Sequence, residues 1–472
     1  MKWTAGAKLA QQALQFLLFM VLMRLLGPAA FGLVGMVTVF SGFAAIFSEL
    51  GFGSALVQRQ EVSEVHRSTV FWLTMIVATL LGGMLLAAGP LIAEFYKEPQ
   101  LRPMSAWIGL SFLFSAPGIV SRSLLTKDMR FDALARADVA ALGISGVVAA
   151  IAAVEGAGAW SLVAQQLASA AVTSALLLWF AKWRPRLIWS FSAARELLGF
   201  GAGLTGFNIV NYWARSADKL LIGHLLGSLP LGLYSRAYSL MLLPLTQIVG
   251  IVTPVMFPAM STIKNDTARV RRVFLRMTGV LSFIVFPMMF GLAVVAKPFV
   301  LGLFGQKWVE AIPLIRVLAL VGIVQTLTNP TGLIYISQGK TNWIFWWGIG
   351  SSTVLVLAIV IGSLMGSVMD VATAYLMGNL MVVGPCLAIP GRLIGMSLGD
   401  IWQVIAGNLA CSAGMAALVW GVSLILPADW PAAMQLIVLV ATGAVTYTAL
   451  AWVSRLSVLS ELSQIRVRIA SA

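Results

Sequence analysis

The sequence is poor in charged residues, which make up only 10% of its 472 positions. A soluble globular chain carries roughly 25%, and a disordered chain combines high charge with few apolar residues. This chain instead has 60% hydrophobic residues and a mean hydropathy of +0.93. The composition therefore excludes both classes and predicts an integral membrane protein.

Cysteine and histidine are also scarce, with two residues of each. Cys386 and Cys411 lie inside apolar segments, and His66 and His224 are far apart in the sequence. We therefore expect no disulfide, no metal site and no cofactor. Signatures of catalysis are missing too: no external loop holds paired carboxylates, no glycine-rich phosphate loop precedes a basic residue, and no nucleophile has an evident base.

Long hydrophobic runs recur along the whole chain, and each is long enough to cross a hydrocarbon core of about 30 Å. They are too long and too uniformly apolar for barrel strands, so the predicted fold class is an all-α polytopic membrane protein. About 14 transmembrane helices leave ~12 residues for each connection, which is too few for a soluble domain. The predicted spans are 9–26, 31–49, 69–89, 104–120, 137–153, 159–181, 199–226, 234–258, 277–302, 311–337, 343–363, 371–391, 403–426 and 433–453.

The net charge of +14 would suggest nucleic acid in a soluble protein, but in a membrane protein basic residues gather in cytoplasmic loops. We therefore expect no nucleic acid partner. One set of alternating connections and tails holds 22 of the 31 cations, whereas the opposite set holds only Lys97, Arg102 and Lys307. This asymmetry predicts that both termini are cytoplasmic.

An internal repeat relates residues 24–33 to residues 224–233, with five identical positions in ten at an offset of 200. Both copies join an outward-going span to the inward-going span that follows, although chance similarity in a Leu/Gly-rich chain is the alternative. Six spans separate the copies, and an even number predicts a parallel repeat of two six-helix lobes. The predicted domains are an N-lobe (1–181), a basic cytoplasmic linker (182–198), a C-lobe (199–391) and two extra helices with a cytoplasmic tail (392–472).

The most polar span is 199–226, where Asn208, Asn211, Arg215 and Asp218 step by three, four and three residues and so share one helix face. Lys219 flanks this face. Charge within a membrane is costly, which makes such residues candidates for a functional site. The face either lines a water-filled cavity that meets substrate, or forms a structural ion pair of Arg215 with Asp218 between helices. Asp218 is also the one good candidate for coupled titration, although an Arg215 partner would oppose its protonation.

Further cations lie outside the basic loops, in the predicted outer halves of their helices. They either snorkel to outer headgroups or line the same cavity, and for Arg24 and Arg316 we favour the cavity. A positive chamber suits an anion, and arginine can bind phosphate oxygens through two hydrogen bonds.

Several segments resemble the Wzx-type polysaccharide flippases, which export O-antigen and colanic acid units. "RLLGPAAFGLV" and "ELGFGSALVQR" resemble the opening of these proteins, and "ADKLLIGHLLGSLPLGLYSRAYSLMLLPLTQIVGIVTPVMFPAMS" followed by "DTARVRRVFLRM" resembles them more strongly. The similarity extends over most of the chain and is strongest at about residues 196–280. These motifs are structural turns more than chemical signatures, so they indicate the family more firmly than the substrate.

The resemblance implies two six-helix lobes around a central cavity in the bacterial inner membrane, working by alternating access. The implied cargo is an undecaprenyl-pyrophosphate-linked oligosaccharide for lipopolysaccharide, exopolysaccharide or capsule. It also implies cavity cations on the pyrophosphate, a role that we assign to Arg24, Arg215, Lys219 and Arg316. The sugar would contact Asn208, Asn211, Tyr212 and Trp213. A polysaccharide polymerase and a chain-length regulator are the partners that it suggests.

Three other functions are weighed against this one. A multidrug antiporter of the same fold would need cavity carboxylates for cationic drugs, and the first span contains no acid. A membrane enzyme of polymer assembly would need a larger polar loop. A non-transporting scaffold would not need charges inside the membrane.

Overall fold

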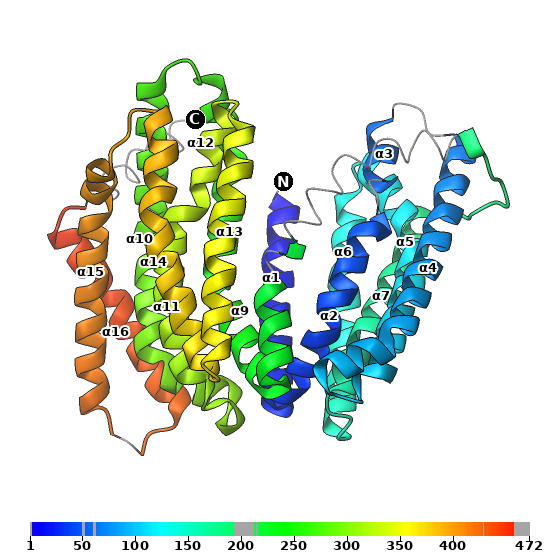
Figure 1. The fold of residues 1–472 in the computed structure, drawn as a ribbon, viewed down its shortest axis with the longest axis horizontal. Helices are drawn as coiled ribbons and strands as arrows, with labels where there is room; N and C mark the ends of the chain where they lie inside the picture. The colour runs from blue at the N-terminus through cyan, green and yellow to red at the C-terminus, as the bar shows by residue number, and fades with distance from the viewer. Residues whose placement is uncertain are drawn as a thin grey trace. The chain divides into compact units, whose positions relative to one another are not determined.

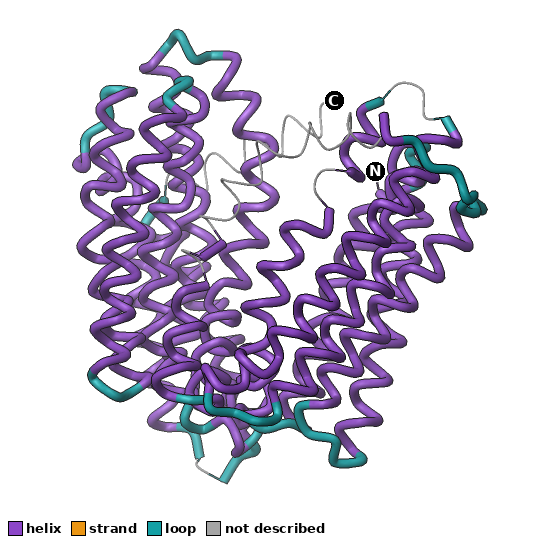
Figure 2. Tube along the Cα trace, turned by 45° about the vertical axis from the view of Figure 1, so that its right-hand side comes forward, coloured by secondary structure: helices purple, strands orange, loops and turns teal. Residues whose placement is uncertain are grey.

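A computed structural model describes residues 2–49, 52–59, 63–192, 212–213, 216–427 and 429–456. These residues form helices joined by turns and loops, and no strand occurs among them (Figure 2). The chain divides into two compact units, Met1–Gly232 and Leu233–Ala472.

The described part of the first unit begins with the helices α1 to α7, and the helical stretch 216–226 follows later in the chain (Figure 1). Its helices are α1 (Lys2–Leu25), α2 (Pro28–Glu49), the short α3 (Phe52–Gln58), α4 (Glu64–Tyr96), α5 (Leu101–Lys127), α6 (Phe131–Val154) and α7 (Trp160–Ala181). Within it α5 packs against α4 and α7, and α6 packs against α1 and α7. Small residues allow close approach: a Cβ atom on Gly82 of α4 would lie 2.9 Å from the Gly109 carbonyl oxygen of α5.

The helix α9 (Ser228–Thr262) runs from the end of the first unit into the second. The second unit continues with α10 (Thr267–Phe299), α11 (Ala311–Thr328), α12 (Gly332–Ser337), α13 (Thr341–Leu364), α14 (Val368–Leu393), α15 (Leu398–Ile425) and α16 (Ala432–Val453), and with the short helices η1 (Val300–Phe304), η2 (Gln306–Trp308) and η3 (Asn329–Thr331).

Polar side chains attach the last two long helices to α10. Asn408 of α15 donates from Nδ2 to the Gly279 carbonyl oxygen at 3.1 Å and to Ser282 Oγ at 2.8 Å. The Tyr447 hydroxyl of α16 donates to the Phe283 carbonyl oxygen at 2.7 Å. Such bonds stabilise helix association where lipid, as apolar as the side chains, supplies little hydrophobic driving force.

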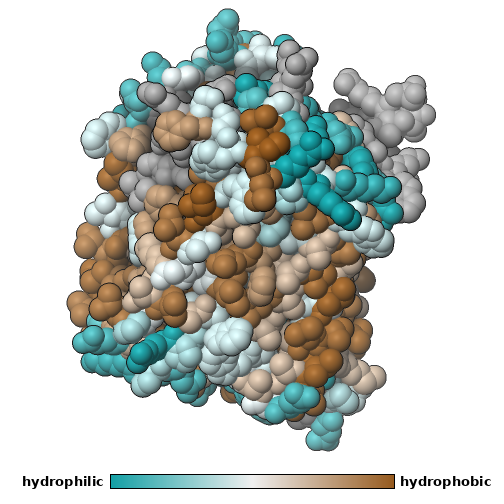
Figure 3. Space-filling view, turned by 90° about the vertical axis from the view of Figure 1, so that its right-hand side faces the viewer, coloured by the Kyte–Doolittle hydropathy of each residue, from teal (hydrophilic) through white to brown (hydrophobic). Residues whose placement is uncertain are grey.

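Eleven helical segments of the described chain are long and apolar enough to cross a membrane. They correspond to predicted spans, and the structure adds helices at 9–26 and 234–258, where α1 and α9 lie. The predicted span 199–226 falls largely outside the described residues, although 216–226 is helical. Hydrophobic residues cover the middle of the face in Figure 3, and hydrophilic residues gather above and below. The prediction of an all-helical polytopic membrane protein is therefore confirmed.

Candidate functional site

The two copies of the sequence repeat form equivalent helix junctions. α1 ends at Leu25 and α2 begins at Pro28, whereas the helical stretch 216–226 is followed by α9 from Ser228. Gly227 bridges the second junction with φ +95°, a conformation that suits a residue without Cβ. A proline or serine at the first helical position also fits, because backbone N–H groups there have no partner within the helix.

The two junctions contact each other within the first unit, and the contact is reciprocal. A Cβ atom added to Gly32 would overlap the Ser228 carbonyl oxygen, and one added to Gly232 would overlap the Pro28 carbonyl oxygen. Pro28 and Ser228, like Gly32 and Gly232, are related by the 200-residue offset. Each repeat copy thus presents the same glycine to the same position of the other copy, so two helix backbones cross at closest approach.

The turn between α4 and α5 supports this crossing from the side. His224 donates from Nδ1 to the Phe95 carbonyl oxygen at 2.7 Å and stacks on the Phe95 ring, with ring centroids 4.2 Å apart. Ser228 Oγ donates to Glu98 Oε1 at 2.9 Å. These contacts were not predicted from the sequence. The one feature of the sequence that pointed to them was His224, one of only two histidines, which lies inside the repeat.

Tyr212 and Trp213, predicted to contact sugar, are half-buried against α2. The Tyr212 hydroxyl donates to the Val39 carbonyl oxygen at 2.6 Å, and Gly42 leaves room for it, since a Cβ there would lie 2.5 Å from that hydroxyl. The Trp213 ring lies 5.1 Å from the Phe43 ring. Both side chains therefore anchor this part of the chain to α2 in the conformation seen.

Asp218 is buried, with 7% of its surface exposed, and its Oδ1 accepts the backbone N–H of Lys219 at 2.7 Å. The Lys219 side chain is half-buried. Asn208, Asn211 and Arg215 lie outside the described residues, so the pairing of Arg215 with Asp218 stays a prediction. A buried aspartate next to a half-buried lysine fits the predicted polar character of this span.

The other two predicted cations are exposed and lie in different units. Arg24 occupies the last turn of α1 in the first unit, whereas Arg316 lies on α11 in the second. Their convergence with Lys219 on one pyrophosphate stays a prediction. Among the described residues, no group of three or more metal-ligating side chains could hold a metal ion.

A second polar cluster, which sequence reasoning missed, is buried in the second unit between α11 and α14. Gln325 donates from Nε2 to the Tyr375 hydroxyl at 3.0 Å, and Asn379 Nδ2 donates to the Tyr375 carbonyl oxygen at 2.8 Å. These residues are neutral and bonded to one another, which makes them suited to joining helices in lipid rather than to holding an ion. Gln325 and Tyr375 are 50 residues apart in the sequence, so no local sequence pattern predicts their contact.

Comparison with solved structures identifies the class to which this fold belongs. The chain superposes with a TM-score of 0.72 on the lipid II flippase MurJ in an inward closed conformation, covering 96% of this chain and 98% of that chain at 13% identity. At that identity the likeness shows the fold alone. The same fold is found in a multidrug resistance MATE family transporter of the MOP superfamily, on which the chain superposes with a TM-score of 0.64 at 15% identity, covering 81% of this chain and 94% of that chain.

Sequence comparison then identifies the family. The family model described as "Polysaccharide biosynthesis protein" matches residues 21–313. The chain is 30% identical over 452 residues to the teichuronic acid biosynthesis protein TuaB of Bacillus subtilis (strain 168), covering 94% of this chain and 93% of that protein. It is also 28% identical over 378 residues to the lipopolysaccharide biosynthesis protein WzxC of Escherichia coli (strain K12), covering 80% and 77%. The chain therefore belongs to the Wzx-like polysaccharide biosynthesis family, whose members are transporters and not enzymes.

Proposed function

We propose that the chain is a flippase that moves undecaprenyl-pyrophosphate-linked oligosaccharide repeat units across the bacterial inner membrane. The units would serve lipopolysaccharide O-antigen, exopolysaccharide or capsule biosynthesis. The observation that carries the proposal is the similarity to TuaB, which covers nearly the whole of both chains and whose name places that relative in teichuronic acid biosynthesis. The MurJ-like fold supports it, because that protein is a flippase for another lipid-linked molecule.

The proposed architecture has 14 transmembrane helices: two six-helix lobes related by a parallel repeat, and two C-terminal helices. The eleven long apolar segments, together with α1, α9 and the predicted span 199–226, supply that number. The reciprocal contact of Gly32 and Gly232 supports the repeat, because chance similarity would not place equivalent residues against each other. The distribution of basic residues supports cytoplasmic termini.

In the proposed mechanism, the two lobes alternate between inward-open and outward-open states and no covalent chemistry occurs. Arg24, Arg215, Lys219 and Arg316 would hold the pyrophosphate while the polyprenyl tail stays in lipid, and Asn208 and Asn211 would contact sugar. Asp218 would balance the charge of its neighbours between transport steps. A cavity of cations favours a diphosphate because each contact is a charge-assisted hydrogen bond.

The experiment that tests this function is mass spectrometry of undecaprenyl-linked saccharides in a deletion strain of the source bacterium. We expect complete repeat units to accumulate on the lipid carrier while surface polysaccharide falls. Loss of a polymerase partner could give the same pool, so leaflet-specific labelling must place the accumulated units on the cytoplasmic side. A normal lipid-linked pool together with increased drug susceptibility would contradict the proposal and favour a multidrug antiporter.

A further inference from the structure

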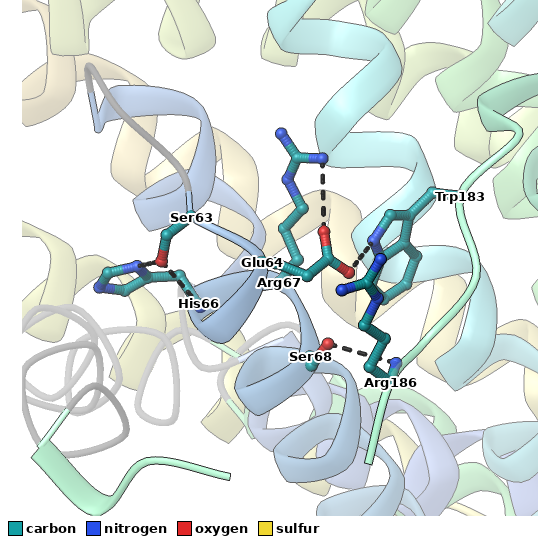
Figure 4. Close-up of polar contacts among 7 residues, drawn as sticks. All are labelled: Ser63, Glu64, His66, Arg67, Ser68, Trp183 and Arg186. Atoms are coloured by element: carbon teal, nitrogen blue, oxygen red, sulfur yellow. Dashed lines mark hydrogen bonds and ion pairs between the residues drawn. The ribbon is translucent and has the colours of Figure 1, made fainter. Parts of the chain in front are cut away.

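The segment that follows α7, residues 182–192, is called the strap here; it has no regular secondary structure from 183 to 190, becomes helical at 191–192, and lies against the start of α4 (Figure 4). Trp183 donates from Nε1 to Glu64 Oε1 at 2.9 Å, and the Arg186 backbone N–H donates to Ser68 Oγ at 3.3 Å. Two further hydrogen bonds continue the attachment: Trp72 Nε1 to the Arg186 carbonyl oxygen at 2.9 Å, and the Ser190 backbone N–H to Thr69 Oγ1 at 3.2 Å. Four bonds hold the strap in one place on α4.

The length of α4 places the strap at the level of the lipid headgroups. A helix of 33 residues is about 50 Å long, whereas the hydrocarbon core is about 30 Å thick. Roughly 10 Å, or about seven residues, therefore extends beyond the core at each end. The strap is bonded to positions 64, 68, 69 and 72 of α4, which span this protruding end and the first turn inside the core. Tryptophans such as Trp72 and Trp183 are typical of this depth.

The outer face of the strap is apolar and open. Leu187 is 91% exposed, Trp189 48% and Phe191 75%, whereas Trp183 between strap and helix is buried. Three large apolar side chains held outward at headgroup depth fit the boundary between headgroups and acyl chains.

The charge of the strap selects the kind of lipid. Lys182, Arg184 and Arg186 are exposed, and the segment 182–192 contains no acidic residue. The carboxylate that contacts the strap, that of Glu64, already accepts from Trp183 and lies 3.8 Å from the Arg67 guanidinium. Arg186 holds the strap through its backbone alone in these bonds, which leaves its guanidinium available to phosphate.

We propose that the strap is a docking surface for anionic glycerophospholipid, with Lys182, Arg184 and Arg186 on lipid phosphates and Leu187, Trp189 and Phe191 among the upper acyl carbons. The inference goes beyond transport of the cargo, since it assigns a bound lipid class to the segment between the proposed lobes. Each basic residue near an anionic surface strengthens the attraction about fivefold, so two of them contribute roughly 25-fold.

The test is hydrogen–deuterium exchange of residues 182–192 in the full-length protein while phosphatidylglycerol is titrated into neutral phosphatidylcholine nanodiscs. We expect phosphatidylglycerol to slow exchange of the strap in the unmodified protein, a comparison that needs no variant. The double variant Arg184→Gln/Arg186→Gln should weaken the apparent affinity for phosphatidylglycerol roughly 25-fold. It should fold normally, because the bonds of Arg186 to Ser68 and Trp72 use its backbone.

The matched control is Lys97→Gln/Arg102→Gln, which removes two exposed cations from the opposite set of connections. This control should leave the strap's response to phosphatidylglycerol unchanged. Equal exchange of the strap in neutral and anionic nanodiscs would overturn the proposal. It would also be overturned if the control variant lost as much apparent affinity for phosphatidylglycerol as Arg184→Gln/Arg186→Gln. Slowing by undecaprenyl phosphate in neutral lipid, without slowing by phosphatidylglycerol, would also overturn it and assign the strap to the cargo.

Discussion

Among individual residues, the charged side chains of the span 199–226 bear most directly on transport. Lys219 is half-buried beside the buried Asp218, whose carboxylate already accepts a backbone N–H. We predict that Arg215→Ala and Lys219→Ala each lower export of lipid-linked saccharide roughly tenfold or more, since a hydrogen bond between charged groups contributes about 1.5–3 kcal/mol. Lys219→Arg should retain most of the export because it keeps the charge.

The measurement is surface polysaccharide at matched protein level, with Lys307→Ala as a control cation in a connecting segment. Unchanged export in Arg215→Ala and Lys219→Ala would remove both residues from the site. Equal loss in Lys307→Ala would show that overall charge, and not this position, is responsible.

The Tyr212 hydroxyl makes a prediction about stability. It donates to the Val39 carbonyl oxygen at 2.6 Å and to the Thr38 carbonyl oxygen at 3.4 Å, so Tyr212→Phe removes these half-buried hydrogen bonds and leaves the ring against Phe43. We expect a loss of about 1 kcal/mol in the free energy of unfolding, measured as a lower melting temperature in detergent. An unchanged melting temperature would mean that these bonds are not maintained in the purified protein, and that the hydroxyl is available for sugar.

At the scale of elements, the crossing of α2 with α9 depends on the absence of two side chains. Gly32→Ala or Gly232→Ala would place a Cβ on a backbone carbonyl oxygen, which cannot move aside as a flexible side chain can. We predict that each substitution destabilises the protein by about 1–3 kcal/mol, the usual range for overpacking, and that the two have similar effects because the contact is reciprocal. Thermal unfolding of the purified variants measures this.

Gly83→Ala is the matched control for this prediction. Gly83 lies on the exposed face of α4 with no atom within 4 Å of an added Cβ. Alanine there should be neutral or slightly stabilising, because glycine weakens a helix by about 0.5–1 kcal/mol. A Gly32→Ala variant as stable as Gly83→Ala would show that the crossing is looser than the structure indicates.

The positions of the helices were largely predictable from hydrophobicity, whereas their ends were not. α4 extends from Glu64 to Tyr96, beyond the predicted 69–89. Its first turn, capped by Ser63, contains the charged residues Glu64 and Arg67, so hydropathy did not assign that turn to the span. α10 begins at Thr267 with the basic run through Arg276, ten residues before the predicted span. Hydropathy finds the part of a helix inside the hydrocarbon, and polar turns beyond it carry no such signal.

The candidate site was less predictable than the helices, for a different physical reason. The repeat was visible in the sequence, but contact of Gly32 with Ser228 joins positions almost 200 residues apart. The bond between Gln325 and Tyr375 likewise joins separate helices. Periodicity within one helix says which residues share a face, but which neighbour that face meets depends on tertiary packing.

At the scale of the whole molecule, the uneven distribution of cations predicts how the chain crosses the membrane. Both native cysteines are buried, so Cys386→Ser/Cys411→Ser is expected to give a folded background without thiols. Single cysteines in that background at Lys97 and Lys307 should react in intact cells with a membrane-impermeant maleimide, whereas those at Arg184 and Lys340 should react only after lysis. Basic residues are retained on the cytoplasmic side during insertion, which is the physical reason for this expectation.

The reverse labelling pattern would mean that the chain has the opposite orientation in the membrane. Different labelling of the two residues of one pair would mean that the predicted number of spans between those two residues is wrong. The predicted span 199–226 lies between the two residues of each pair, so it must cross the membrane once for either pair to share one side.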